Sequence, residues 1–296
     1  MASHTPLLHE RPAASAVSAG QPLRGVAWFG RLCRYPPGLI GLLIVVLYVC
    51  LALFAEAIAP YSASEQDLTA TLQAPSAAHW FGTDQYGRDI FSRVLIGSRD
   101  ILLLAFSSAA LGLLLGTSVA LVAGYYGGTL DELLMRAMDM LMSFPALLLA
   151  LLILATFGSA LLNLVVCIGI VFMPRVARVI RSVVLKIRVQ DYVTAAQVRG
   201  ESGYSILVRE ILPNARGPLV VEGAIRLSYA ILIGASLGFL GLGLQPPSPD
   251  WGLQVSEGRI FLLTAPWVSV FPALAIASLV IGANLLADGL MHALQP

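Results

Sequence analysis

The sequence predicts an all-α membrane protein with six transmembrane helices, and three observations lead to this fold class. Of the 296 residues, 57% are hydrophobic and 12% are charged, and the mean hydropathy is +0.82. Apolar runs long enough to cross a hydrocarbon core of about 30 Å recur along the chain. The net charge of +1 and the scattered His and Cys residues predict no nucleic-acid partner, no metal site and no bound cofactor.

The chain divides into an N-terminal tail, residues 1–35, and a transmembrane domain, residues 36–296. The tail is polar and rich in Ala, Ser and Pro, and a short interfacial helix is expected near its end. A polar outer segment, residues 60–99, follows the first span. Pro145, within the third span, is the candidate break, and it can equally be a kink. The predicted spans cover residues 39–59, 100–125, 133–157, 160–179, 218–242 and 267–290.

Six spans place both ends of the chain on one side of the membrane, and the Lys and Arg residues predict which side that is. The segments on the side of the termini hold most of them. The outer segments hold Arg88, Arg93, Arg99 and Arg259. Cytoplasmic segments of membrane proteins carry the excess of positive charge. Both termini and the polar segment 191–214 are therefore expected in the cytoplasm.

Residues 191–214 form a polar segment with a helical pattern between two long apolar runs. Asp191 is placed to cap a first short helix, and Gly200 is placed to end it. Ser202 is placed to cap a second helix, and Pro213 to close that helix. The sequence therefore predicts a helix–turn–helix at the membrane surface, with a face of small residues that a partner can approach closely.

The same segment resembles the EAA loop of membrane subunits in binding-protein-dependent ABC importers. In that family the loop docks in a groove of a cytoplasmic ATPase. The resemblance assigns this coupling role to Thr194, Ala195, Ala196, Gly200, Ile211, Leu212 and Pro213. Thr194 stands where the family usually has Glu, so a contact made by that carboxylate is not expected here. An ordinary amphipathic loop between spans is the alternative.

A stretch of the outer segment resembles a second motif of these importers. Its matching residues are Gly82, Thr83, Asp84, Gly87, Arg88, Asp89, Ser92 and Arg93. This match narrows the resemblance to the second, C-type, permease of importers for dipeptides, oligopeptides and nickel. Asp84 and Arg88 are expected to pair at helical spacing. The stretch either acts directly beneath the binding protein or only packs the second span.

A third match to the family covers residues 234–252, at the end of the fifth span. Gly234 and Gly238 form a small-xxx-small pair, as do Gly112 and Gly116 in the second span. Such pairs allow helix backbones to approach closely. Packing inside the chain is expected for the second span. For the fifth span, a seam with a second permease is an equal alternative.

Three ionisable residues are predicted at membrane depth, where each costs about 2.5–3.5 kcal/mol on insertion scales. Glu222 and Arg226 lie four residues apart on the fifth span, so they can neutralise each other on one helix face. They form either a structural pair or part of the transport pathway. Asp139 is the third, and its neighbour Arg136 is the expected partner if it lies near the inner surface.

The chain is not expected to hydrolyse ATP or to contain catalytic residues. A phosphate-binding loop needs Gly-Lys followed by Ser or Thr, and Lys186 is the only lysine present. The family resemblance, which covers residues 35–294, implies a type I permease fold in the bacterial inner membrane and transport by alternating access. It also implies a second permease subunit, two ATPases that bind ATP and Mg, and an extracytoplasmic binding protein.

Di- or oligopeptides are the substrates that the resemblance implies. Nickel, glutathione or an opine carried by the same machinery are alternatives. A secondary transporter that works without ATPases is the alternative mechanism.

Overall fold

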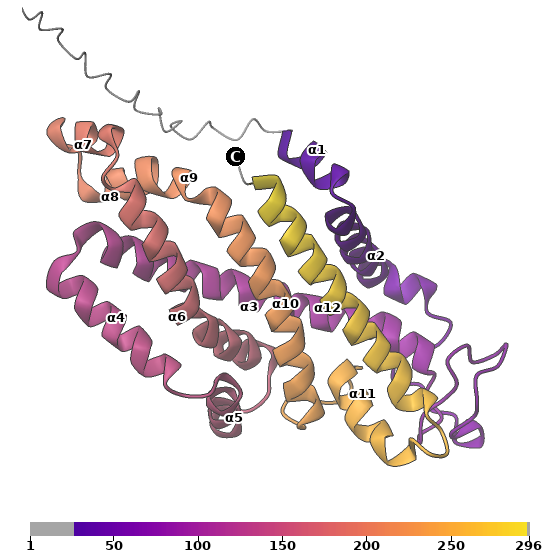
Figure 1. Ribbon diagram of the computed structural model, residues 1–296. Coiled ribbons are helices and arrows are strands. Elements are labelled where there is room, and N and C mark those ends of the chain that lie inside the picture. Colours follow the sequence, from indigo (N-terminus) through magenta and orange to yellow (C-terminus); the bar gives the residue numbers. More distant parts are fainter. Residues whose placement is uncertain (1–26, 295–296) are drawn as a thin grey trace, which may run out of the picture.

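The computed structural model describes residues 27–294 of the chain (Figure 1). Most of the predicted N-terminal tail therefore lies outside the described residues. Within 27–294 the secondary structure is helical, apart from one isolated antiparallel bridge between Thr83 and Asp89. The predicted all-α class is confirmed.

The helices follow one another with short connections, except for the outer segment that joins Pro36–Ile58 to Ile90–Tyr126. In chain order they are α1 (Ala27–Arg34), α2 (Pro36–Ile58), η1 (Leu68–Ala70), α3 (Ile90–Tyr126), α4 (Gly128–Met142), α5 (Ala146–Phe157), α6 (Leu161–Ile187), α7 (Asp191–Val198), α8 (Gly203–Ile206), η2 (Leu207–Ile211), α9 (Leu212–Asn214), α10 (Arg216–Phe239), α11 (Trp251–Gly258), η3 (Arg259–Phe261) and α12 (Trp267–Leu294). Among these, α2, α3, α6, α10 and α12 are long and apolar enough to cross a membrane.

Two of the membrane helices are longer than the hydropathy of the sequence predicted. Helix α3 begins at Ile90, because the Asp89 carboxylate caps it by accepting a bond from the Ser92 N–H, at 2.8 Å. The helix therefore starts ten residues before the predicted start of the span at residue 100. Helix α6 continues to Ile187 instead of ending at 179. Charged residues lower the hydropathy of both extensions without interrupting the helix.

The third predicted span is not one straight helix. Helices α4 and α5 meet at an angle of 83°, with a break of three residues from Ser143 to Pro145. Pro145 is the N-cap of α5, so the predicted break is at the right residue. A proline cannot donate the backbone hydrogen bond that would continue α4. The chain therefore turns sharply where a straight crossing was expected.

Glycines set the distances between the long helices. A Cβ on Gly112 would lie 2.7 Å from the Phe172 Cβ, and one on Gly116 would clash with Val176, so α3 and α6 pack closely. This confirms the internal packing expected for the second span. Gly234 and Gly238 are also buried inside the chain, against Leu104 of α3 and the turn that begins α11. The alternative of a subunit seam at these two glycines is wrong.

A pair of glycines that the sequence analysis passed over brings α2 against α12. A Cβ on Gly41 would clash with the backbone of α12 at Leu286, and one on Gly282 would clash with Ile44 of α2. Both glycines are buried. Because two backbones are in contact here, α2 is held on the bundle by close approach as well as by apolar side chains.

The buried apolar residues form two separate cores. The larger core fills the bundle between α2, α3, α5, α6, α10, α11 and α12. The smaller core lies at the other end of α3 and α6 and includes residues of α7, α8 and η2. Figure 1 shows α7 and α8 at one end of the bundle and α11 with the outer segment at the opposite end.

Candidate functional site

The segment predicted to couple to a partner forms the helix–turn–helix that the sequence suggested. Gly200 has a φ of +76°, a left-handed conformation that glycine adopts without strain, and it ends the first helix. The Ser202 hydroxyl accepts a bond from the Ser205 N–H at 3.2 Å, which confirms Ser202 as the second cap. Gln190, not Asp191, is the N-cap of α7, and Asp191 lies in its first turn.

The second helix of this segment is not closed by Pro213. Residues Leu207–Ile211 form a π-helical turn, the helical path continues through Leu212–Asn214, and α10 begins at Arg216. Pro213 lies within this continuous path, just after the π-helical turn, and lacks the N–H that would donate to the preceding turn. The helix therefore continues past the proline.

The two faces of α7 have different environments. Val193 and Ala196 are fully buried and pack in the smaller core with Ile206 and Ile211. The expectation that Ala196 packs against a partner was therefore wrong, because this chain itself covers it. Small side chains permit close approach, but the sequence does not say to which neighbour.

The exposed face of the segment mixes apolar and polar side chains and is available to a partner. Val198 is 84% exposed and Tyr204 is 75% exposed, and Thr194 and Ala195 lie on the same exposed side. Among the predicted coupling residues, Ile211 is buried, Leu212 is half-buried, and Gly200 and Pro213 are exposed. The segment thus has one face fixed to the bundle and one free face that includes exposed apolar side chains.

Polar contacts fix the inner ends of the helices beneath this segment. The Arg181 guanidinium donates two bonds to the Asp131 carboxylate, which ties α6 to α4. Arg188 donates to the Gly124 carbonyl at 2.8 Å, which ties the end of α6 to α3. The segment is therefore mounted on three helices that are linked to one another.

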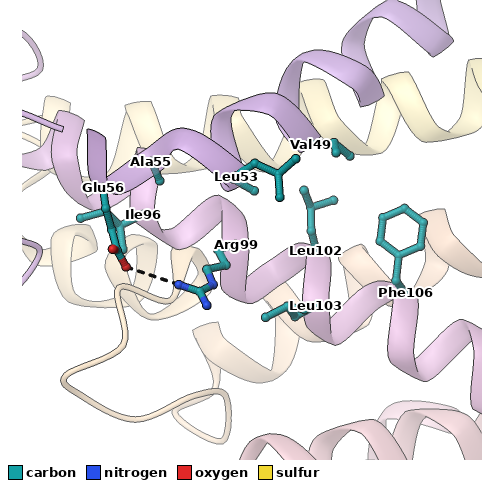
Figure 2. Close-up of a pocket in the computed structure, with 10 residues that line it drawn as sticks. Val49, Leu53, Ala55, Glu56, Ile96, Arg99, Leu102, Leu103 and Phe106 are labelled. Carbon is teal, nitrogen blue, oxygen red and sulfur yellow. Dashed lines mark hydrogen bonds and ion pairs between the residues drawn. The ribbon is translucent and has the colours of Figure 1, made fainter. Parts of the chain in front are cut away.

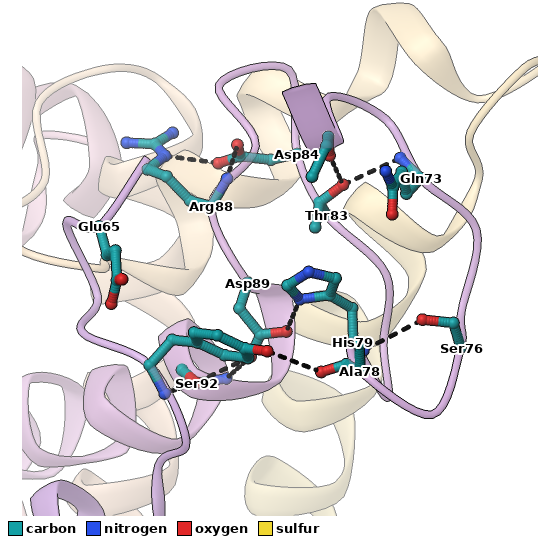
Figure 3. A network of polar contacts seen from close by, with 12 residues as sticks. Glu65, Gln73, Ser76, Ala78, His79, Thr83, Asp84, Arg88, Asp89 and Ser92 are labelled. Atoms are coloured by element: carbon teal, nitrogen blue, oxygen red, sulfur yellow. Dashed lines mark hydrogen bonds and ion pairs between the residues drawn. The ribbon is translucent and has the colours of Figure 1, made fainter. Parts of the chain in front are cut away.

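The outer segment is organised by the Asp84 carboxylate (Figure 3). It accepts bonds from the backbone N–H of Tyr86 and Arg88, at 2.8 and 3.0 Å, and from the Arg88 Nε at 2.6 Å. Arg88 also reaches Glu257 of α11, at 3.1 Å. The expected Asp84–Arg88 pair forms, but in a tight turn before α3 and not on a helix.

A second set of contacts in Figure 3 surrounds Asp89. One oxygen of its carboxylate lies 3.0 Å from the His79 Nδ1, and the other accepts from the Ser92 hydroxyl at 2.7 Å. The Thr83 hydroxyl accepts from the Gln73 N–H at 2.9 Å, and Arg93 donates to the Ala63 carbonyl at 2.9 Å. These contacts join residues far apart in the outer segment into one folded cap.

All eight residues of the predicted outer motif are buried. Gly82 and Gly87 have φ values of +75° and +71°, and a Cβ on Gly87 would clash with the backbone of Asp67. The motif therefore folds the cap and attaches it to α3 and α11. The side chains that the cap exposes are others, among them Leu68, Trp80 and Tyr86.

The turn into α11 contains two buried residues that the sequence analysis did not interpret. Trp251 is fully buried and its indole donates to the Val94 carbonyl of α3, at 3.0 Å. The Asp250 carboxylate caps α11 by accepting from the Leu253 N–H at 2.7 Å. Burial, assisted by the nearby Asp100 charge, raises the pKa of Asp250 to about 6. The bonds that its carboxylate accepts from backbone N–H groups act in the opposite direction. The sequence signal that could have identified this helix cap is an acidic residue just before a short helix.

We expect Asp250 to make the outer cap less stable as the pH rises. The folded pKa of about 6 exceeds the ordinary value, so its stabilising contribution is complete below about pH 4 and is lost as the pH passes through 6. Asp250→Asn keeps a capping oxygen but cannot ionise. The melting temperature of the variant, relative to the parent protein, should therefore increase between pH 4.5 and pH 7.5. A difference that stays constant over this range would contradict the prediction.

Glu222 and Arg226 form an ion pair on α10. The Arg226 Nε lies 2.7 Å from the Glu222 carboxylate, and the two side chains are 8% and 6% exposed. The guanidinium also lies over the rings of Phe172 and Tyr229, at 5.6 and 5.3 Å from their centroids. The predicted pairing is therefore present. Glu222 also lines a groove of about 350 Å³ with Pro218 and Met291. A role of the ion pair in the transport pathway stays a prediction.

Asp139 does not pair with Arg136. It lies on the exposed side of α4 and forms an ion pair with Arg178 of α6, while Arg136 binds Glu132 one turn away on its own helix. The neighbour in the sequence was the wrong partner, because the packing of α4 on α6 brings a closer cation. Asp139 thus belongs to the contact between these two helices.

An apolar groove of about 500 Å³ lies between α2 and α3 (Figure 2). Leu53, Leu102 and Phe106 are among the side chains that line it. The ion pair between Glu56 and Arg99, at 3.3 Å, lies at one end of the groove and is largely exposed. The remaining lining is hydrocarbon, so the groove lacks the polar groups that a charged solute needs.

Comparison with protein-family models gives two matches that together cover most of the chain. Residues 112–296 match the family described as binding-protein-dependent transport system inner membrane component. The chain belongs to this family. Residues 23–75 match the N-terminal transmembrane domain of oligopeptide transport permease C. This transport family is the one that the sequence motifs indicated, and its members are permeases of ABC importers.

Individual members of the family are similar to the chain over most of its length. The dipeptide transport system permease protein of Alkalihalophilus pseudofirmus is 39% identical over 292 residues, which is 99% of this chain and 95% of that protein. The glutathione transport system permease protein of Pectobacterium atrosepticum is 42% identical over 255 residues, 86% of this chain and 85% of that protein. The glutathione permease of Escherichia coli O157:H7 is 42% identical over 267 residues, 90% and 88% of the two chains.

Proposed function

We propose that this permease forms the translocation pathway of an importer for di- or oligopeptides, together with a second permease subunit. Two ATPases bind on the cytoplasmic side, and an extracytoplasmic binding protein delivers the substrate. The similarity to dipeptide and glutathione permeases supports a substrate with a peptide backbone, because glutathione is itself a peptide. ATP and Mg bind to the ATPases and not to this chain.

The observation that carries the coupling role is the two-sided burial of α7. Val193 and Ala196 fix one face to the bundle, while Val198 leaves an apolar side chain almost fully exposed. Tyr204 of α8 is also exposed, so the free face offers a partner two apolar side chains to cover. Binding of ATP to the partner subunits would then move this segment and the bundle attached to it.

Uptake by the reconstituted complex tests the proposal. The chain would be purified with the second permease and the ATPases encoded beside it, and placed in liposomes with its binding protein. We expect ATP-dependent uptake of a radiolabelled dipeptide. Uptake of glutathione, nickel or an opine in place of peptides would change the assigned substrate. Uptake that continues without the ATPases would instead indicate a secondary transporter.

The proposed orientation predicts which residues a reagent can reach from outside an intact cell. A cysteine at Ser62, in the exposed outer segment, should react with a thiol reagent that does not cross the membrane. A cysteine at Ser202, in the turn between α7 and α8, should react only after the cells are opened. The native cysteines Cys33, Cys50 and Cys167 would be replaced first. Labelling of the cysteine at position 202 in intact cells would reverse the orientation.

A further inference from the structure

We propose that Arg175 binds the carboxylate of the transported peptide at the break between α4 and α5. The inference rests on the proposed function, since it names the chemical group by which a peptide is held inside the permease. It starts from a row of arginines on α6, which comprises Arg175, Arg178 and Arg181 at intervals of three residues. Residues at this spacing lie close to one another on a helix surface.

The acids of α4 neutralise two members of this row. Asp131 binds Arg181, and Asp139 binds Arg178. The third acid of α4, Glu132, is bound to Arg136 of the same helix. Helix α4 ends at Met142, so the position beside Arg175 is taken by the break, which contains no acidic residue. In the described part of the chain, Arg175 has no carboxylate partner.

The charge of Arg175 is open to the surroundings of the chain, because its side chain is exposed. It lies about 21 Å along the helix axis from Leu161, at 1.5 Å per residue. The span predicted from hydropathy ends at residue 179, so Arg175 lies in the part of this membrane helix nearer to α7. Ionisable groups at that depth face a polar cavity or a partner and mark transport pathways more often than they serve stability.

A pocket of about 140 Å³ lies at the break, and Arg175 lines it together with Phe144, Pro145 and Pro174. The pocket is small beside the volumes that hold whole organic ligands, so it suits one end of a peptide, such as its carboxylate group. Ile170 also lines the pocket, and Pro174 has no N–H to donate to its carbonyl. The guanidinium can donate two parallel bonds to a carboxylate, and that carbonyl can accept from a neighbouring peptide N–H.

Figure 1 shows how the fold places this pocket. Helices α4 and α5 meet beside α6, on the part of the bundle away from the folded outer cap. Transporters place substrate groups on broken helices at mid-membrane, where backbone groups are freed from helical bonds. The break at Ser143–Pro145 and the proline in α6 supply such groups next to one uncompensated cation.

Uptake by the complete complex gives the first test. Arg175→Met should lower ATP-driven dipeptide uptake at least tenfold, and Arg175→Lys should restore part of it, because lysine keeps the charge but not the two parallel bonds. The matched control replaces the exposed pair on α4, with Arg136→Met and Glu132→Gln together, and should stay within twofold of the parent. An Arg175→Met complex that transports within twofold of the parent overturns the proposal. A parent complex without ATP-driven uptake would instead contradict the proposed function itself.

Protection of a cysteine gives the second test, and it reports binding directly. Ser143→Cys would be made in a complex whose permease lacks Cys33, Cys50 and Cys167, and the rate of its reaction with a thiol reagent would be measured. A dipeptide should slow the reaction, the same dipeptide with an amidated C-terminus should not, and Arg175→Met should abolish the difference. Equal protection by both peptides, or protection by neither, overturns the proposal.

A role for Arg175 in holding the second permease gives a different pattern. In that case Arg175→Met would separate the two permeases during purification, and the two peptides would not differ in the protection experiment. This pattern overturns the proposal, because losing a subunit contact lowers the yield of the complex without changing its selectivity for a peptide carboxylate.

Discussion

Val198→Glu is expected to release the ATPases from the purified complex while the membrane bundle stays folded. Val198 is the last residue of α7 and is 84% exposed, so the substitution disturbs no contact within the chain. A carboxylate in the centre of an apolar interface would lie buried and unpaired, which weakens binding by more than about tenfold. The measurement is the amount of ATPase that copurifies with the tagged permease, followed by ATP-driven uptake, and both should fall together.

Two controls separate loss of docking from loss of folding. Leu263→Glu makes the same kind of change at a fully exposed residue beside α12, at the opposite end of the molecule, and should keep both ATPases. Thr194→Ala should also be mild, since no carboxylate is present there to lose. In contrast, Ala196→Glu should reduce the amount of folded protein, because that side chain is buried in the smaller core. A Val198→Glu complex that keeps the ATPases and normal uptake would show that α7 is only a linker.

Glu222→Gln is expected to lower the amount of folded permease strongly. It removes the acid that binds Arg226, whose side chain is 8% exposed on a membrane helix. An unpaired buried charge costs about 3–5 kcal/mol, a large part of the stability of a domain. Glu222→Gln combined with Arg226→Met removes both charges and should recover most of the protein. The measurement is the yield and melting temperature of the two variants in detergent.

The comparison of the two variants also tests a role in transport. If both are produced in equal amounts and both fail to transport, the pair contributes to the pathway and not mainly to folding. If the double variant is stable and transports peptide, the pair is structural.

The sequence predicted most of the bundle because long apolar runs report membrane helices directly. It predicted the ends of these helices less well. At Ile90–Arg99 and beyond residue 179, arginines and a lysine lower the hydropathy, but capping and ion pairs keep both stretches helical. The break at Pro145 could be located because proline lacks an N–H. The angle of 83° between α4 and α5 could not be predicted, because it depends on how α4 packs on α6.

The candidate site shows a similar division. Local signals were reliable where the contact is local, as for the turn at Gly200 and the cap at Ser202. They failed where two distant segments compete for one side chain. Asp139 binds Arg178 instead of its neighbour Arg136, and Ala196 is covered by residues of this chain. The position of a small or charged residue in the sequence is the same whichever partner it contacts, so the position alone does not identify the partner.

The two separate cores have a mechanical consequence. The smaller core joins α7, α8 and the last turns of α6 into one stiff arm, whose length from Pro174 to Ile187 is about 20 Å. Phe172 belongs to the larger core and Val176 to the smaller one, so Pro174, with its missing backbone bond, lies at the junction. The smaller core also includes Ala120 of α3, and Gly124 of α3 packs closely against Val184, so a push on α7 would be carried into α3 and α6 together. Arg175, one residue beyond Pro174, lies where that push would pass from the smaller core to the larger one.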